Sequence, residues 1–150
     1  MRALRHLAAV LLLPGVVAGL VPILLVEHPS LGPVWPLGAA LLAAGLSLMA
    51  WTIALFATVG RGTLAPWDPT QRLVARGPYR RVRNPMISGV LAVLVGQAAL
   101  FGSWPVLIWA GTVFLINDTY FRLIEEPGLR DRFGADYEAY MASTPRWIPR

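Results

Sequence analysis

The chain has 150 residues, of which 56% are hydrophobic and only 14% are charged, a composition typical of a membrane protein and a length that suits one domain. All the basic groups behind its net charge of +5 are arginines beside apolar runs, so we expect anionic lipid headgroups or an anionic ligand as counter-charges, and no nucleic acid. Because the chain contains no cysteine, disulfides, thiolate metal sites and a cysteine nucleophile are excluded.

The first predicted element is a membrane span over residues 7–26, a run without charged side chains. Twenty helical residues cover about 30 Å, the thickness of one hydrocarbon core. A cleaved signal peptide with residues 16–18 as its cleavage site is the alternative, but the run continues to Val26 and favours a retained span. Pro14 and Pro22 are expected to kink this helix.

The second predicted span covers residues 34–59, where Gly38, Gly45 and Ala50 are small enough to let a neighbouring helix approach closely. A polar loop of residues 60–84 follows, with six arginines and a single acidic residue. The loop begins with a loose G-x-G-x-x-A dinucleotide pattern. We reject a dinucleotide site because the pattern follows an apolar helix rather than a strand, and two prolines then prevent the helix it should open.

An apolar hairpin is predicted next, with spans over residues 85–101 and 105–123. Asn84 is a good N-cap, and Pro85 suits the first position of the third helix, where its missing N–H costs nothing. Gly102 suits the C-cap of that helix. With so short a turn, the fourth helix is expected to pack antiparallel to the third and to end near residues 125–126.

The tail of residues 125–150 is predicted to lie at the membrane surface as an amphipathic helix, broken into two pieces at Gly134. Its apolar face collects Leu129, Phe133, Tyr137, Tyr140 and Met141. Residues 145–149 then form an extended segment. The predicted fold is all-α: a single membrane domain with four transmembrane helices and a C-terminal interfacial amphipathic helix.

The distribution of arginines predicts the orientation of this domain. The N-terminus holds two arginines, the first turn none, the loop 60–84 six, the hairpin tip none, and the segment from Arg122 onward five. Since basic residues favour the cytoplasmic side, we expect a multi-pass protein of the cell (inner) membrane with both termini in the cytoplasm. The loop and the tail then meet at the open, cytoplasmic end of the hairpin.

A metal site is not expected, since His6 and His28 stand at opposite ends of the first span, far from the charged clusters. For the same reason no Ser-His-Asp set can form. On the fourth helix, Asp118, Arg122 and Glu125 share one face at 100° per residue. An i,i+4 ion pair between Asp118 and Arg122 is the structural interpretation of this stripe.

Glu125 and Glu126 have few local basic partners, so their counterparts are expected among Arg80, Arg81 and Arg83 across the hairpin mouth. Ionisable groups near hydrocarbon are costly and indicate function. An arginine beside the free N–H groups of a helix start, opposite two carboxylates, suits a zwitterionic ligand such as an amino acid. A salt bridge that only fixes the hairpin is the structural alternative.

These landmarks together resemble the integral-membrane methyltransferases typified by isoprenylcysteine carboxyl methyltransferase and the phospholipid N-methyltransferases. The resemblance covers about half of the chain, from Gly77 to the end, and is carried by residues 77–80, 83–86, 125–127, 133–134 and 145–149 with Tyr137 and Tyr140. It implies methyl transfer from S-adenosylmethionine to a lipid-like or prenylated acceptor, a carboxylate or an amine, that enters from the bilayer.

The resemblance also implies which residues bind S-adenosylmethionine. Arg83, Asn84 and the helix start would take the donor's carboxylate, Glu125 and Glu126 its ammonium or ribose hydroxyls, and Tyr79 and Met86 would pack on its adenine. No catalytic residue is assigned.

The chain departs from the family pattern Arg-His-Pro-x-Tyr-x-Gly at two positions, where it has Asn84 and Ile87. Neither side chain is an acid or base near neutral pH. A methyl displacement needs alignment more than proton transfer, so methyl transfer remains the preferred hypothesis. The alternatives are a related membrane reductase that uses NADPH, and a non-catalytic membrane protein whose Arg–Glu hairpin is structural.

Overall fold

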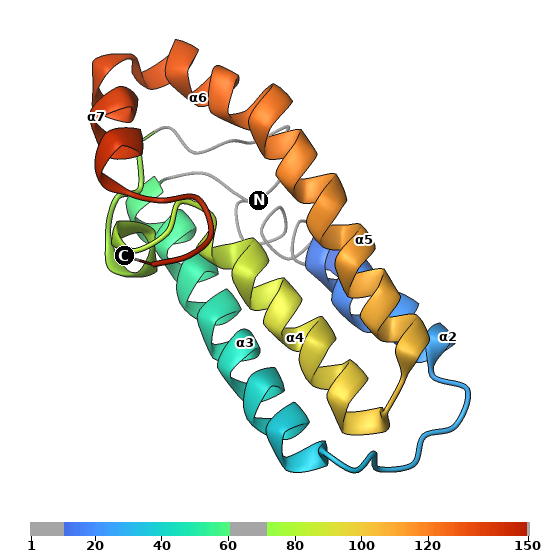
Figure 1. Cartoon of the computed structure of the whole chain (residues 1–150). Helices are drawn as coiled ribbons and strands as arrows, with labels where there is room; N and C mark the ends of the chain where they lie inside the picture. Colours follow the sequence, from blue (N-terminus) through green and yellow to red (C-terminus); the bar gives the residue numbers. More distant parts are fainter. Residues whose placement is uncertain (1–10, 61–71, 150) are drawn as a thin grey trace.

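The computed structural model describes residues 11–60 and 72–149, and within these ranges the chain forms helices and connecting segments without a strand (Figure 1). The predicted all-α fold is therefore confirmed for the described residues. His6 and the start of the first predicted span lie outside them, as do residues 61–71 of the predicted loop.

The first described segment consists of a π-helix, η1 (Leu11–Leu20), followed directly by the α-helix α2 (Val21–Leu25). Pro14 lies inside η1, and Pro22 stands in the first turn of α2. A proline removes one intrahelical bond and crowds the preceding turn, so a departure from regular α-helix is expected around both residues.

The second predicted span corresponds to α3 (Trp35–Leu55) and its π-helical continuation η2 (Phe56–Gly60). Among the described residues, Trp35–Gly60 is the one helix that is long and apolar enough to cross a membrane, while Pro14–Leu25 and Pro85–Phe101 are apolar but shorter. Length and composition thus support one span, and the other three remain predictions.

The third helix, α4 (Pro85–Phe101), has the bounds predicted from the sequence and packs along α3. Glycines make this contact close: a Cβ added to Gly45 would lie 2.7 Å from Gly89 O, and one added to Gly96 would lie 2.9 Å from Gly38 O. The predicted role of Gly38 and Gly45 is therefore confirmed, whereas Ala50 is exposed and does not share it.

Gly96→Leu is expected to lower the free energy of unfolding by about 1–3 kcal/mol, the usual cost of overpacking, because a Cβ would lie 2.7 Å from the backbone nitrogen of Leu42 and 2.9 Å from Gly38 O. Thermal unfolding in detergent measures this loss. Gly111→Leu is the matched control, since a Cβ at Gly111 would meet nothing within 4 Å. Equal melting temperatures for the two variants would contradict this account of the α3–α4 contact.

The hairpin turn forms as predicted. Gly102 adopts a left-handed conformation with φ 63° at the end of α4. Ser103 then caps the next helix, α5 (Trp104–Tyr120), where its side chain accepts a hydrogen bond from Val106 N. Because only these two residues separate the helices, α5 runs back antiparallel to α4 (Figure 1).

The predicted end of the fourth helix near residues 125–126 is wrong. The helix continues through the π-helical η4 (Phe121–Glu125) into α6 (Glu126–Phe133), with Pro127 in the first turn of α6. Pro127 lacks an N–H and crowds the carbonyl four residues before it, and the wider π-helical turn that precedes it accommodates this. The helix ends instead at Gly134, whose φ of 53° requires glycine, and α7 (Ala135–Ser143) follows.

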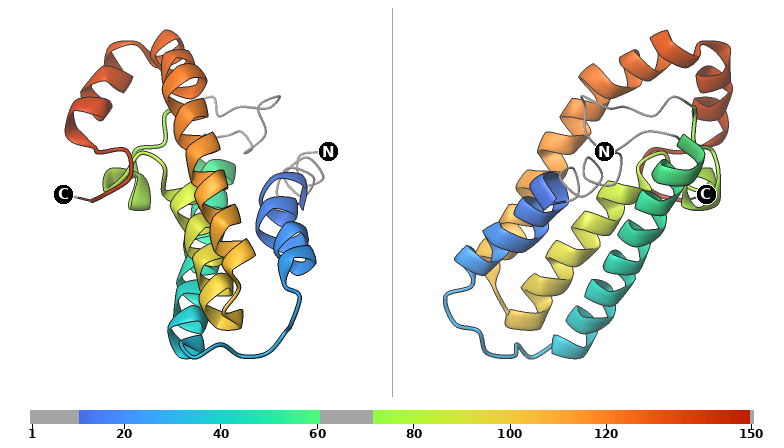
Figure 2. Two further views of the ribbon diagram at one scale, coloured as in Figure 1. Left: turned by 45° about the vertical axis from the view of Figure 1, so that its right-hand side comes forward. Right: turned by 180° about the vertical axis from the view of Figure 1, so that it is seen from behind.

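Side chains from α4 and α5 attach the first segment to the hairpin. Because Pro22 has no N–H, the carbonyls about one turn before it lack an intrahelical donor. Gln97 Nε2 donates to Ala18 O over 2.8 Å, and Trp109 Nε1 donates to Val17 O over 2.9 Å. The left view in Figure 2 shows this segment on the opposite side of α5 from α7.

The helices α4 and α5 meet at their turn and diverge toward the other end of the molecule (Figures 1 and 2). There α6 leads away from α4, and α7 turns back toward the segment that precedes α4. That segment contains the short 3₁₀-helix η3 (Gly77–Arg80). The polar loop and the C-terminal tail are thereby brought together at the open end of the hairpin.

Candidate functional site

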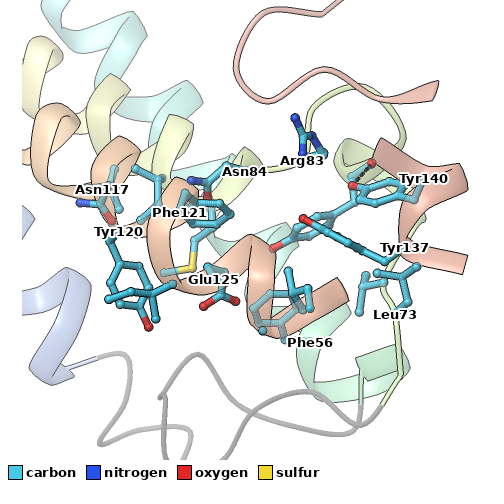
Figure 3. Close-up of a pocket in the computed structure, with 18 of the residues that line it drawn as sticks. Phe56, Leu73, Arg83, Asn84, Asn117, Tyr120, Phe121, Glu125, Tyr137 and Tyr140 are labelled. Atoms are coloured by element: carbon cyan, nitrogen blue, oxygen red, sulfur yellow. Dashed lines mark hydrogen bonds between the residues drawn. The ribbon is translucent and has the colours of Figure 1, made fainter. Parts of the chain in front are cut away.

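A cavity of about 640 Å³ lies where α4 begins and where η4, α6 and α7 fold over it (Figure 3). Its volume is within the usual range for small-molecule sites. Five of the six predicted donor-binding residues line it: Tyr79, Arg83, Asn84, Met86 and Glu125. The sixth, Glu126, is not part of the lining.

Asn84 occupies the N-cap position of α4, but its side chain makes no capping hydrogen bond, contrary to the prediction. Its backbone conformation, with φ −126° and ψ 54°, is not the extended one typical of a capping residue. The residue is only 4% exposed, and its amide Nδ2 has no hydrogen-bond partner among the described residues.

Arg83 presents a second buried donor beside Asn84. Its Nε has no hydrogen-bond partner in the part of the chain that the structure describes. A buried donor left without an acceptor costs about 1–3 kcal/mol, and more when the group is charged. Both residues line the cavity, so a ligand that brings an acceptor to these donors, preferably an anionic one, would satisfy them.

Glu126 is held by two arginines. Its Oε1 accepts hydrogen bonds from Arg83 Nη1 at 2.7 Å and from Arg146 Nε at 2.8 Å, and its Oε2 accepts one from Arg146 Nη2 at 2.8 Å. Burial would raise the pKa of this carboxyl, but the Arg146 hydrogen bonds and the two positive charges outweigh burial and hold the pKa below its usual value. Glu126 is therefore held in its ionised form, and both of its oxygens accept hydrogen bonds from arginines.

The sequence predicted one of these two partners. Arg83 was among the three arginines expected across the hairpin mouth, while Arg80 and Arg81 are exposed at the surface. Arg146 was not predicted as a partner, because the extended tail has no periodicity from which a side-chain direction follows. Its position is set by a backbone bond, in which Arg83 N donates to Pro145 O over 2.8 Å.

The predicted pair between Asp118 and Arg122 is confirmed, with Arg122 Nε 2.8 Å from Asp118 Oδ2. Asp118 also accepts a hydrogen bond from Trp147 Nε1 at 2.8 Å. The Trp147 ring lies against Phe114 and Phe121, with centroid separations of 5.3 and 6.3 Å. Asp118 therefore attaches the tail to α5 and does not line the cavity.

Glu125 faces the cavity and differs from Glu126 in its electrostatics. Burial raises the pKa of the Glu125 carboxyl, and the Arg132 charge and a hydrogen bond from Tyr120 offset this only in part. Consecutive helical residues point about 100° apart, so one glutamate can face the cavity while the other faces the arginine pair. The sequence could not tell which of the two would do so.

Aromatic side chains form much of the remaining wall. The Tyr79 ring stacks on Phe56 with centroids 5.4 Å apart, and Tyr140 Oη donates to Tyr79 O over 2.6 Å. Tyr137, beside Tyr140 in Figure 3, is almost completely buried. Burial raises the pKa of all three tyrosines, so their phenols remain neutral.

The apolar face predicted for the tail therefore lines the cavity with four of its five members, namely Leu129, Phe133, Tyr137 and Tyr140. The sequence pattern identified the face correctly but gave no indication that it would turn inward. Among the described residues, no group of three His, Cys, Asp or Glu side chains is placed to hold a metal ion.

The family model of the phospholipid methyltransferases matches residues 34–136, more than half of the chain. The match includes all six predicted donor-binding residues and ends before Tyr137, so the tail with Tyr140 and Arg146 lies beyond it. No curated protein matches the chain.

Proposed function

The chain belongs to the phospholipid methyltransferase family, and from this membership we propose that it transfers a methyl group from S-adenosylmethionine to a lipid-like acceptor in the membrane. The observation that carries the proposal is a pair of buried donors, Arg83 Nε and Asn84 Nδ2, that have no partner among the described residues and belong to two residues lining a cavity that Glu125 also lines. The hydrogen-bond donors of Arg83 and Asn84 suit the carboxylate of an amino acid, and the Glu125 carboxylate suits its ammonium.

In this proposal, each part of S-adenosylmethionine is assigned to residues of the lining. Arg83 and Asn84 would hold the donor's carboxylate, assisted by the free N–H groups at the start of α4. Glu125 would hold its ammonium or ribose hydroxyls, and Tyr79 and Met86 would pack on the adenine. When bound, the donor supplies an electrophilic methyl group on a sulfonium. We assign Glu126 to the same site through Arg83, whose guanidinium it contacts.

The acceptor side of the proposal rests on the apolar part of the same lining. Val17, Val90 and Val113 reach the cavity from three different helical segments, η1, α4 and α5. Such a wall suits a hydrocarbon chain, and an acceptor held there would be oriented toward the donor. Asn84 and Ile87 provide no acid or base, so we propose that this chain contributes alignment and assign no catalytic residue.

We also propose that the domain crosses the membrane four times with both termini in the cytoplasm. Large apolar side chains that face outward on α5, such as Trp104, Ile108 and Leu115, suit contact with lipid. In this arrangement the loop, the start of α4 and the tail lie together at the cytoplasmic surface, where a soluble donor and a lipid acceptor can both reach the cavity.

A ligand screen by thermal shift in detergent tests the function. S-adenosylmethionine and its demethylated product are expected to raise the melting temperature, because a ligand that binds only the folded state stabilises it. A shift with NADPH alone would indicate the membrane reductase instead. No shift with any of the three, at concentrations up to the millimolar range, would leave the structural Arg–Glu hairpin as the better interpretation.

A further inference from the structure

We propose that Arg146, in the C-terminal tail, is a positioning residue for the donor site: it holds Glu126 so that Glu126 fixes the Arg83 guanidinium at the cavity wall. The nature of the ligand rests on the proposed function, whereas the positioning itself is a property of the protein alone. Arg146 does not line the cavity and lies beyond the residues matched by the family model.

The geometry of the pair supports this role. Arg146 binds both oxygens of Glu126 at 2.8 Å, a two-pronged arrangement that fixes the plane of the carboxylate. The carboxylate then receives Arg83 Nη1 at 2.7 Å on Oε1. One nitrogen of Arg83 is thus tied down, while its Nε remains without a partner among the described residues.

The tail that carries Arg146 is itself fixed on both sides. Pro145 O accepts the backbone hydrogen bond from Arg83 N, and Trp147 donates to Asp118 and contacts the rings of Phe114 and Phe121. The guanidinium of Arg146 is therefore presented to Glu126 from a rigid segment rather than from a freely moving end. Loss of this one side chain leaves the neighbouring attachments of the tail in place.

Arg146 also changes the charge that Arg83 can offer to a ligand. If Glu126 paired with Arg83 alone, its negative charge would neutralise that arginine. Sharing the carboxylate with Arg146 leaves positive charge on Arg83, while Asp118, 3.9 Å from Arg146, compensates the second arginine. The arrangement therefore keeps Arg83 both oriented and attractive to an anionic group.

Calorimetry with S-adenosylmethionine and nitrogen NMR of Arg83 test this role in the full-length protein. Arg146→Gln is expected to weaken donor affinity about tenfold, within the range for residues coupled through one ion-pair network, without changing the number of sites. Arg146→Lys keeps the charge but loses the two-pronged bond, so this variant is expected to bind the donor more weakly than the wild type and more tightly than Arg146→Gln. Arg130→Gln is the matched control, because Arg130 is exposed and lies 4.0 Å from Glu138 at the surface.

The Arg83 Nε–H resonance, identified by its loss in Arg83→Lys, reports positioning without a ligand. It is expected to shift and broaden in Arg146→Gln and to stay unchanged in Arg130→Gln. A wild-type resonance in Arg146→Gln, or wild-type donor affinity in that variant, would overturn the inference. If the unmutated protein binds no donor, the proposed function fails, and the resonance still decides whether Arg146 positions Arg83. Should Arg146→Gln not fold, the same two measurements on Arg146→Lys decide.

Discussion

Glu126→Ala is expected to lower the free energy of unfolding by about 3–5 kcal/mol, because it leaves two arginines facing each other without their shared carboxylate. The side chains of Arg83 and Glu126 are only 12% and 11% exposed, so water replaces the lost partner poorly. Chemical or thermal unfolding in detergent measures the loss. Glu138→Ala, at a carboxylate that is 63% exposed, is the control and is expected to change stability by about 0.5 kcal/mol or less.

The contribution of Glu126 to stability also has a defined dependence on pH. Since the folded protein lowers the pKa of Glu126, this contribution is fully present above the ordinary glutamate pKa and is lost as the pH falls through the lower, folded value. The difference in stability between the wild type and Glu126→Ala should therefore shrink only in acid below the usual carboxyl range. A difference that disappears already near neutral pH would contradict the ionised, doubly paired Glu126.

Glu125→Gln is expected to weaken the binding of S-adenosylmethionine by about 2–3 kcal/mol, because it removes the carboxylate proposed to meet the donor's ammonium. The amide keeps the size of the side chain, so the fold should persist. Calorimetry of the wild type and the variant gives the comparison. Glu138→Gln serves as the control, with the same chemical change at an exposed position that does not line the cavity.

Donor affinity should depend on pH in the direction set by Glu125. The free protein holds the pKa of Glu125 above its ordinary value, chiefly through burial, and an ammonium is bound by the ionised form. Affinity should therefore fall as the pH is lowered, beginning above the range in which an ordinary glutamate titrates. Glu125→Gln should lose this dependence. If Glu125→Gln binds the donor like the wild type, Glu125 is not a ligand of the ammonium.

Local patterns predicted much of the fold. The third helix has the expected bounds because proline and glycine mark its two ends, and Gly38 and Gly45 lie at the close helix contact because a backbone can approach only where side chains are small. The sequence also placed Arg83 among three arginines expected to face Glu125 and Glu126, and the structure pairs it with Glu126. A cluster of arginines and a pair of glutamates at the same end of a hairpin have few other partners of opposite charge.

The remaining features depend on where individual side chains point and on the path of the chain, and local sequence patterns specify neither. Asn84 has the right residue type for a cap, yet its side chain makes no capping hydrogen bond. Pro127 follows a π-helical turn and does not end the helix. Which of Glu125 and Glu126 faces the cavity depends on how the continuous helix of α5, η4 and α6 is rotated about its axis. Arg146 is placed by the path of an extended tail, for which no periodicity exists.

The central claim, methyl transfer to a lipid-like acceptor, is tested most directly by incubating membranes that contain the protein with methyl-labelled S-adenosylmethionine and then partitioning the products. A lipid held by the apolar lining is already concentrated and oriented, so label is expected in the organic phase. This label should be strongly reduced in Glu125→Gln and retained in Glu138→Gln. Label that depends on Glu125 but stays entirely in the aqueous phase would contradict the lipid acceptor. No transfer in either phase, from protein that binds the donor, would contradict the methyltransferase itself.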